Sequence, residues 1–166
     1  RSQFDLAKNL FQDLLSAITK GHFPQELYTP KRKDALIIKL ANCYYQINED
    51  QTVLKVLEQL SEGSQDHPDA LFLKALAYQR LKQMTEASKA FLSFLNIADS
   101  ENKARISDAH LNLGTIYFHT QDFELAQKHL KLASSDTSIA KLFLAKIQLE
   151  KNNYKALKPL IKEVKK

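Results

Sequence analysis

The stretch that decides the fold is residues 107–133, which read SDAHLNLGTIYFHTQDFELAQKHLKLA. Apolar residues recur there every three or four positions on both sides of a short polar break at residues 120–122. A period near 3.6 is typical of amphipathic helices, and a polar break between two such runs is typical of a turn. The stretch therefore predicts a pair of helices joined by a tight turn.

The same pattern occurs three times in the chain, in a register marked by tyrosines. Each tyrosine follows a small residue by three positions, and the pairs are Ala41 and Tyr44, Ala75 and Tyr78, and Gly114 and Tyr117. The first two tyrosines are 34 residues apart and the next two are 39 apart. Two further columns stay in phase with them, namely Val53, Ala87 and Ala126, and then Leu57, Phe91 and Leu130. Several columns recurring together indicate an internal repeat rather than a chance match.

This repeat resembles the tetratricopeptide-repeat family, whose unit is a helix pair of 34 residues. The third unit is the best match, through Leu113, Gly114, Tyr117, Asp122, Phe123, Ala126, Leu130 and Ala133. The resemblance covers about residues 34–166. It implies an all-α fold, a right-handed solenoid of antiparallel helix pairs with about nine helices. In such an array each pair buries its apolar face against its neighbours, so the repeating columns serve stability rather than chemistry.

We expect the following division of the chain. Residues 1–20 form a helix of a truncated leading repeat, 21–33 an insertion, 34–67 repeat 1, 68–106 an extended repeat 2, 107–137 repeat 3, and 138–166 a degenerate capping repeat. Gly21 is expected to stop the first helix, and Thr29 and Pro30 to cap and start the next. Ser100 is expected to cap the helix that opens repeat 3. Pro159 is expected to kink the last helix of the chain or to delay its start.

The composition agrees with a helical, water-exposed protein. Hydrophobic residues make up 44% and charged residues 26%, while only 3 glycines and 4 prolines are present, too few for the turns of an all-β fold. No apolar run approaches the length of a membrane span. The single cysteine, Cys43, cannot form an internal disulfide and weakly favours the cytoplasm. Because the chain starts at Arg1, directly in helical pattern, we interpret it as a fragment, and its localisation is otherwise unknown.

The resemblance also implies a partner site, since the first helices of such repeats line a concave groove. The groove residues are then Ile38, Asn42, Tyr45, Phe72, Leu76, Arg80, Leu111, Thr115, Phe118, His119, Leu142 and Leu149. Most of them are apolar, which predicts a protein-interaction scaffold that holds an apolar or amphipathic partner segment, with Phe72 and Phe118 as anchors. The alternative is a groove filled by the chain itself, through Phe23, Leu27 and Tyr28, or by a second copy in a homo-oligomer. A third interpretation is a structural segment of a longer superhelix.

The charged clamp with which one chaperone-binding class grips a terminal carboxylate is missing. Asn42 stands in a clamp column, but Ile38 replaces the first lysine and Leu73 the second-unit asparagine. Asp108 and Asn112 replace the third-unit lysine and arginine. An anionic peptide end would therefore lack its cationic partners.

The basic character of the chain belongs to one end. Residues 141–166 carry a net charge of +6, and the remaining residues carry −1. These lysines could meet nucleic acid, acidic lipid or an acidic protein, but they also suit the exposed face of a terminal helix. Aromatic residues do not alternate with them beyond Tyr154, so nucleic-acid binding is disfavoured.

No motif in the sequence indicates an enzyme, a metal site or a cofactor. The five histidines (His22, His67, His110, His119 and His129) are scattered, without the spacing of a metal site. His110 stands in an apolar column and is expected to pack. Cys43 lies among apolar residues and is expected to be an inert core thiol.

Overall fold

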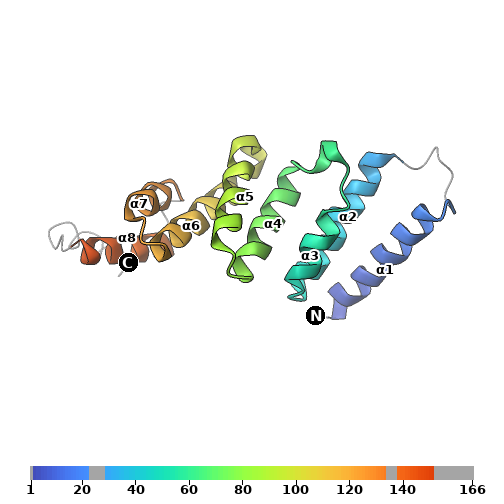
Figure 1. Cartoon of the computed structure of the whole chain (residues 1–166), viewed down its shortest axis with the longest axis horizontal. Coiled ribbons are helices and arrows are strands. Elements are labelled where there is room, and N and C mark those ends of the chain that lie inside the picture. Colours follow the sequence, from blue (N-terminus) through green and yellow to red (C-terminus); the bar gives the residue numbers. More distant parts are fainter. Residues whose placement is uncertain (1, 23–28, 134–137, 152–166) are drawn as a thin grey trace. The chain divides into compact units, whose positions relative to one another are not determined.

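The computed structural model describes residues 2–22, 29–133 and 138–151. These residues form eight α-helices and two short 3₁₀ helices, and no strand occurs among them. The helices are α1 (Ser2–Thr19), α2 (Pro30–Gln46), α3 (Asp50–Leu57), α4 (Pro68–Arg80), α5 (Met84–Ile97), α6 (Lys103–His119), α7 (Phe123–Leu132) and α8 (Ser138–Glu150), with η2 (Glu62–Ser64) and η3 (Ser100–Asn102) between them (Figure 1). The all-α helical-repeat fold is confirmed. The ninth expected helix, with Pro159, lies outside the described residues.

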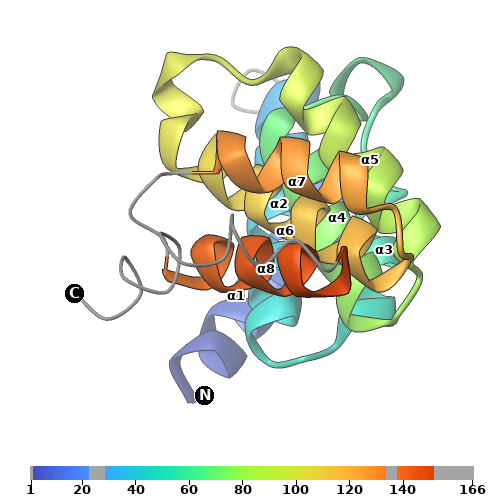
Figure 2. The same cartoon turned by 90° about the vertical axis from the view of Figure 1, so that its left-hand side faces the viewer.

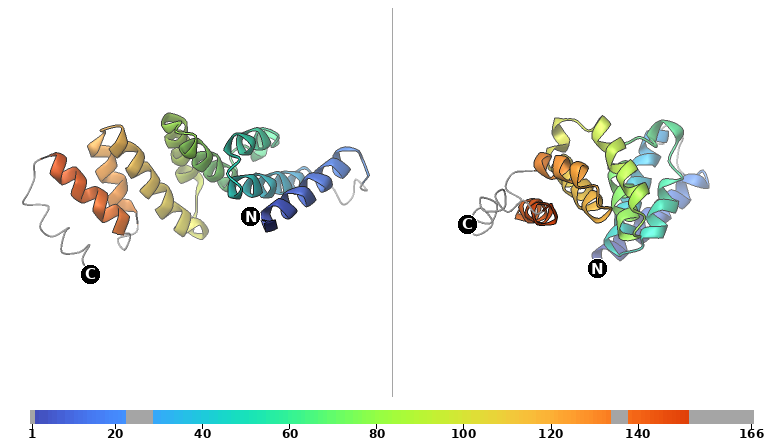
Figure 3. Two further views of the ribbon diagram at one scale, coloured as in Figure 1. Left: turned by 90° about the horizontal axis from the view of Figure 1, so that it is seen from below. Right: turned by 60° about the vertical axis from the view of Figure 1, so that its left-hand side comes forward.

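The chain divides into two compact units, Arg1–Phe94 and Leu95–Lys166, with the boundary inside α5. In the first unit α1 packs on α2, α2 on α3, and α3 on α4 (Figures 1 and 3). The first helices α2 and α4 also contact each other directly. The core between them is built from the repeating apolar columns, including the fully buried Ile37, Ala41 and Val53.

In the second unit α6 and α7 form the closest helix pair, and α8 packs against both of them (Figure 2). The core holds Ala126, Leu130 and Ile147. Gly114 of α6 makes the close approach possible, because a Cβ placed on it would lie 2.5 Å from Cγ of the buried Leu130. The small-residue column therefore has the packing role that the sequence predicted for Gly114.

Three tight turns with the same backbone hydrogen bonds reverse the chain within the helix pairs. The carbonyls of Tyr44, Tyr78 and Tyr117 each accept a bond of 2.9 Å from the amide five residues further on. This is the helix ending in which one residue takes a left-handed conformation, usually glycine. Here the residues with positive φ are Asn48, Lys82 and Gln121 (φ 67°, 60° and 63°).

Replacing Lys82 by glycine is expected to stabilise the protein, because a side chain at positive φ is strained. We expect the free energy of unfolding to rise by about 0.5–1 kcal/mol in urea denaturation. The same change at Lys89, an exposed residue within α5, is the matched control and should lower it by about 1 kcal/mol. A loss of stability in Lys82→Gly would contradict the assignment of strain to this turn.

The helix ends follow the expected caps at two of three places. Gly21 has φ 72° just after α1 ends, and Thr29 caps α2, accepting a bond from the Arg32 amide, with Pro30 as the first helical residue. The expected cap at Ser100 is wrong. Asp99 instead caps the 3₁₀ turn η3, with its carboxylate accepting bonds from the Glu101 amide at 3.0 Å and from Asn102, while α6 begins after Asn102, whose side chain makes no cap bond. An aspartate and a serine are both good cap residues, and the additional 3₁₀ turn, which begins at Ser100, takes the earlier one as its cap.

Candidate functional site

The expected groove residues of the first unit are mostly engaged within the fold. Ile38 of α2 is only 8% exposed and belongs to the core, so it is not part of an exposed apolar strip. Phe72 of α4 is half-buried, with its ring centroid 5.9 Å from that of Phe91 and 5.1 Å from that of Phe94. Leu76 is half-buried and Asn42 is exposed. Phe72 therefore supports the packing of α4 on α5.

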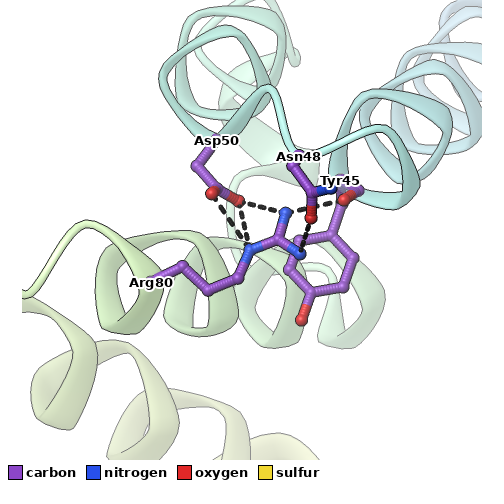
Figure 4. Close-up of polar contacts among 4 residues, drawn as sticks. All are labelled: Tyr45, Asn48, Asp50 and Arg80. Atoms are coloured by element: carbon purple, nitrogen blue, oxygen red, sulfur yellow. Dashed lines mark hydrogen bonds and ion pairs between the residues drawn. The ribbon is translucent and has the colours of Figure 1, made fainter.

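Arg80, at the end of α4, is held by three residues around the first turn (Figure 4). Its Nε donates to both oxygens of Asp50 at 2.8 and 3.0 Å, and its Nη2 donates to the Tyr45 carbonyl at 2.6 Å. Nη1 donates to the Asn48 side-chain oxygen at 2.9 Å, and the guanidinium carbon lies 3.9 Å from the Tyr45 ring centroid. This arrangement combines a bidentate ion pair with a cation–π contact. Arg80 and Tyr45 thus tie the α2–α3 turn to α4.

Sequence reasoning missed Asp50 and Asn48 as partners of Arg80. A signal was present, because Arg80 ends the first helix of one repeat while Asp50 starts the second helix of the repeat before it. Residues at corresponding helix ends of consecutive repeats lie close together when the repeats stack. The ion pair could therefore have been proposed from the repeat register.

The second unit brings several of its expected groove residues together. Leu111, Thr115 and Phe118 of α6 are half-buried, and His119 is exposed. The Phe118 ring centroid lies 5.1 Å from that of Phe143 on α8 and 5.8 Å from that of Phe123. These ring contacts join α6 to α7 and α8, so Phe118, like Phe72, contributes to packing.

An exposed apolar stripe lies on α8. It consists of Ile139, Leu142 and Leu149, which are 51%, 45% and 47% exposed. With Lys146 they are spaced three, four and three residues apart, which places them on one face of the helix. Lys146 Nζ lies 5.1 Å from the centroid of the Phe143 ring beside this face. We call Ile139, Leu142 and Leu149 the α8 stripe.

The helix pairs that carry these residues match a known family. Residues 68–100, which contain α4 and α5, and residues 107–135, which contain most of α6 and all of α7, match the family model of the tetratricopeptide repeat. The chain is a tetratricopeptide-repeat protein. No curated protein matches the chain. Tetratricopeptide repeats are in general protein–protein interaction modules, and the family consists typically of non-catalytic scaffolds.

This tetratricopeptide-repeat protein also contains a histidine pair, with one ring buried and the other half-buried, that sequence reasoning treated as two unrelated residues. His110 of α6 and His129 of α7 approach to 2.9 Å between their Nδ1 atoms, and the Tyr117 ring stacks on His129 with its centroid 5.6 Å away. Burial, then the charges of His110 and Lys128, lower the pKa of His129 to about 4. Burial and Lys128 lower the pKa of His110 as well. Both rings are therefore neutral at pH 7, and His110 packs as the sequence predicted.

Groups that could perform chemistry are sparse in the described part of this tetratricopeptide-repeat protein. No cluster of three or more histidine, cysteine, aspartate or glutamate residues suited to a metal ion is found there. Cys43 is buried, and burial raises the pKa of its thiol, which disfavours the reactive thiolate. No described helix is both long enough and apolar enough to cross a membrane.

Proposed function

We propose that this protein holds a partner protein by an apolar or amphipathic segment, and that the α8 stripe is the principal contact. The observation that carries the proposal is the exposure of Ile139, Leu142 and Leu149 on one face. Large apolar side chains gathered on an accessible face indicate an interaction surface, whereas single ones do not. On this proposal α6 contributes Leu111, Thr115, Phe118 and His119, the residues that the family resemblance places in the same groove.

The groove residues expected from the sequence differ in how far they also serve the packing of the fold. Phe72 and Phe118 contact other rings inside the fold, so replacing them would disturb packing as well as binding. Leu142 and Leu149 are nearly half exposed, so replacing them leaves the core in place. They are therefore the residues on which partner binding can be tested separately from folding.

The double variant Leu142→Gln, Leu149→Gln is expected to lose partner binding while it keeps its helicity. Each leucine would bury its remaining surface in a complex, at about 1 kcal/mol per side chain. The two together are expected to weaken binding by roughly 30-fold. The measurement is panning of a peptide display library on the purified protein, followed by the dissociation constants of the enriched peptides for wild type and variant.

Leu132→Gln is the matched control, because Leu132 of α7 is 55% exposed and does not belong to the stripe. It should bind the enriched peptides as the wild type does. The proposal would be wrong if both variants lost the same affinity for the enriched peptides, or if the library yielded peptides without apolar residues. Sedimentation equilibrium of the same proteins separates the rival role in self-assembly, which would appear as a dimer that Leu142→Gln, Leu149→Gln abolishes. Binding through the stripe should also depend little on salt, unlike binding to nucleic acid.

A further inference from the structure

The first unit contains a pocket of about 540 Å³ that is separate from the α8 stripe. Ala35 and Ile38 of α2 supply its apolar lining, with Lys31 and Lys39 of the same helix beside them. The segment 61–64 and the start of α4 at residues 67–69 complete it. Its volume lies within the range of pockets that take a small ligand or a large side chain.

The wall formed by residues 61–64 is held in place by a buried carboxylate. Asp34 is 4% exposed, and it accepts hydrogen bonds from the Ser61 amide at 3.2 Å and from the Ser61 hydroxyl. Burial alone raises the pKa of Asp34, but the hydrogen bonds from Ser61 and Ser64 outweigh it, so the pKa lies below its ordinary value. The carboxylate therefore stays ionised at neutral pH and fixes the segment. The pocket is formed in advance, which lowers the entropic cost of binding.

The charges around the pocket differ between its two sides. Lys31, Ala35, Ile38 and Lys39 are spaced four, three and one residues apart and share one face of α2. The first turn of α2 contains no acidic residue, although positive charge at a helix N-terminus is unfavourable. Neither Lys31 nor Lys39 forms an ion pair within the described part of the chain. Asp34 of the same helix also lines the pocket, but its carboxylate is buried and bound to Ser61, so the two lysines leave the α2 side with a net positive charge that attracts an anionic group.

The opposite side of the pocket repels such a group. Asp69 at the start of α4 lines that side, and Glu62 and Asp66 lie in the same segment of the chain but outside the lining. An occupant with acidic residues all around its apolar part would meet like charges there. The charge pattern thus selects an occupant whose acidic group lies on the α2 side alone.

We propose that this pocket binds one apolar side chain of a partner protein, next to an acidic residue that pairs with Lys31 and Lys39. The apolar side chain lies against Ala35 and Ile38, and the carboxylate lies over the α2 face. The site goes beyond the proposed role of the α8 stripe, because it lies in the other unit and uses charge as well as apolar contact. The long-range attraction of the lysines also predicts faster association at low salt.

The test uses three synthetic peptides of equal length and isotope-labelled full-length protein. The first peptide has a central leucine with glutamate on one side, the second has alanine in place of the leucine, and the third has lysine in place of the glutamate. The first is expected to bind at least 10-fold more tightly than either of the others. Amide resonances of Ala35, Ile38 and Ser61 should shift on its addition.

Two pairs of variants test the contacts. Gly63 lines the pocket, and a Cβ on it would meet no atom within 4 Å, so Gly63→Ala should bind as the wild type does. Gly63→Trp should fill the pocket and abolish binding of the first peptide without loss of helicity. The double change Lys31→Glu, Lys39→Glu should weaken binding of the first peptide at least 10-fold. Lys55→Glu, on the exposed side of α3, should leave that binding unchanged.

The outcomes are decisive for this site and for the α8 stripe separately. Equal affinity of the first and third peptides would overturn the proposal, as would full binding by Gly63→Trp. Resonance shifts confined to Leu142, Leu149 and their neighbours would also overturn it, while leaving the function of the α8 stripe intact. Loss of the α8 stripe in Leu142→Gln, Leu149→Gln should not affect binding of the first peptide.

Discussion

Gly114→Ala is expected to lower the free energy of unfolding by about 2 kcal/mol, although alanine is the better helix former. The new methyl group would lie 2.5 and 2.7 Å from side-chain carbons of Leu130 and 3.2 Å from its backbone nitrogen. Leu130 is fully buried in the core of the second unit, so it has little room to move. Relief therefore requires α6 and α7 to separate, which loses contacts along the whole pair. Urea denaturation followed by circular dichroism gives the measurement.

Gly63→Ala is the control for the generic effect of this substitution. A Cβ at Gly63 meets no neighbour within 4 Å, so its stability should stay within about 0.5 kcal/mol of the wild type. The double variant Gly114→Ala, Leu130→Ala should be less destabilised than the sum of its two single changes, because the smaller side chain removes the clash. If Gly114→Ala and Gly63→Ala were equally stable, or if the effects in the double variant were strictly additive, the packing of α6 on α7 would not depend on the close approach at Gly114.

Lowering the pH from 7 to 5 is expected to cost the protein about 2 kcal/mol through the histidine pair alone. The pKa of His129 is about 4 in the folded protein and 6.5 ordinarily. Between these values the unfolded chain binds more protons than the folded one. The stabilisation is therefore fully present above pH 6.5 and is lost as the pH falls toward 4. A proton on the accepting Nδ1 would also break the Nδ1–Nδ1 hydrogen bond, in which one nitrogen must accept.

The groups around the histidine pair strengthen the dependence of stability on pH. Lys128 precedes His129 on α7 and adds positive charge, and His110 and the Tyr117 ring cover the imidazole from α6. Asp122 raises the pKa of Tyr117 after burial, so that ring remains neutral throughout this range. The lowered pKa of Asp34 affects stability only below its ordinary value of 3.8, outside the interval tested.

Urea denaturation at pH 7 and pH 5 measures the effect, with His129→Gln as the test variant. The variant should lose most of the pH dependence, whereas His22→Gln, at an exposed position, should retain it. If the free energy of unfolding of His129→Gln still fell between pH 7 and pH 5 as much as that of the wild type, other groups would be the cause of the pH dependence. Amide hydrogen exchange in α6 and α7 should rise at pH 5 relative to the intrinsic rates, since these two helices enclose the pair.

The sequence predicted the helical repeat and its register because apolar columns, small residues and caps act locally. Gly114 and the Thr29–Pro30 helix start show this, since each rests on the backbone or on one neighbouring helix. Contacts between charged or polar groups on separate helices were harder to foresee. Arg80 with Asp50, and His110 with His129, are 30 and 19 residues apart, and each pair meets only after the helices have packed.

The exposure of the expected groove residues could not be predicted from the family pattern. The family pattern places Leu142 and Leu149 in the groove, and the structure leaves them accessible. The same pattern places Ile38 there, but this residue is buried, because the packing between α2 and α4 covers it. The pocket beside Ile38 depends on the hydrogen bonds of Asp34 with Ser61, which no periodic pattern encodes.

The three turns with positive φ have a consequence for how such repeats are recognised. Their geometry is set by amide-to-carbonyl bonds of the backbone rather than by one particular side chain, and asparagine, lysine and glutamine occupy the left-handed position there. The α2–α3 pair closes with the same bonds, yet it lies outside the two matched segments. A divergent array can thus keep the backbone signature of its unit after the side-chain signature has faded. Counting repeats by these bonds, rather than by glycine or consensus letters, should reveal units that sequence models pass over.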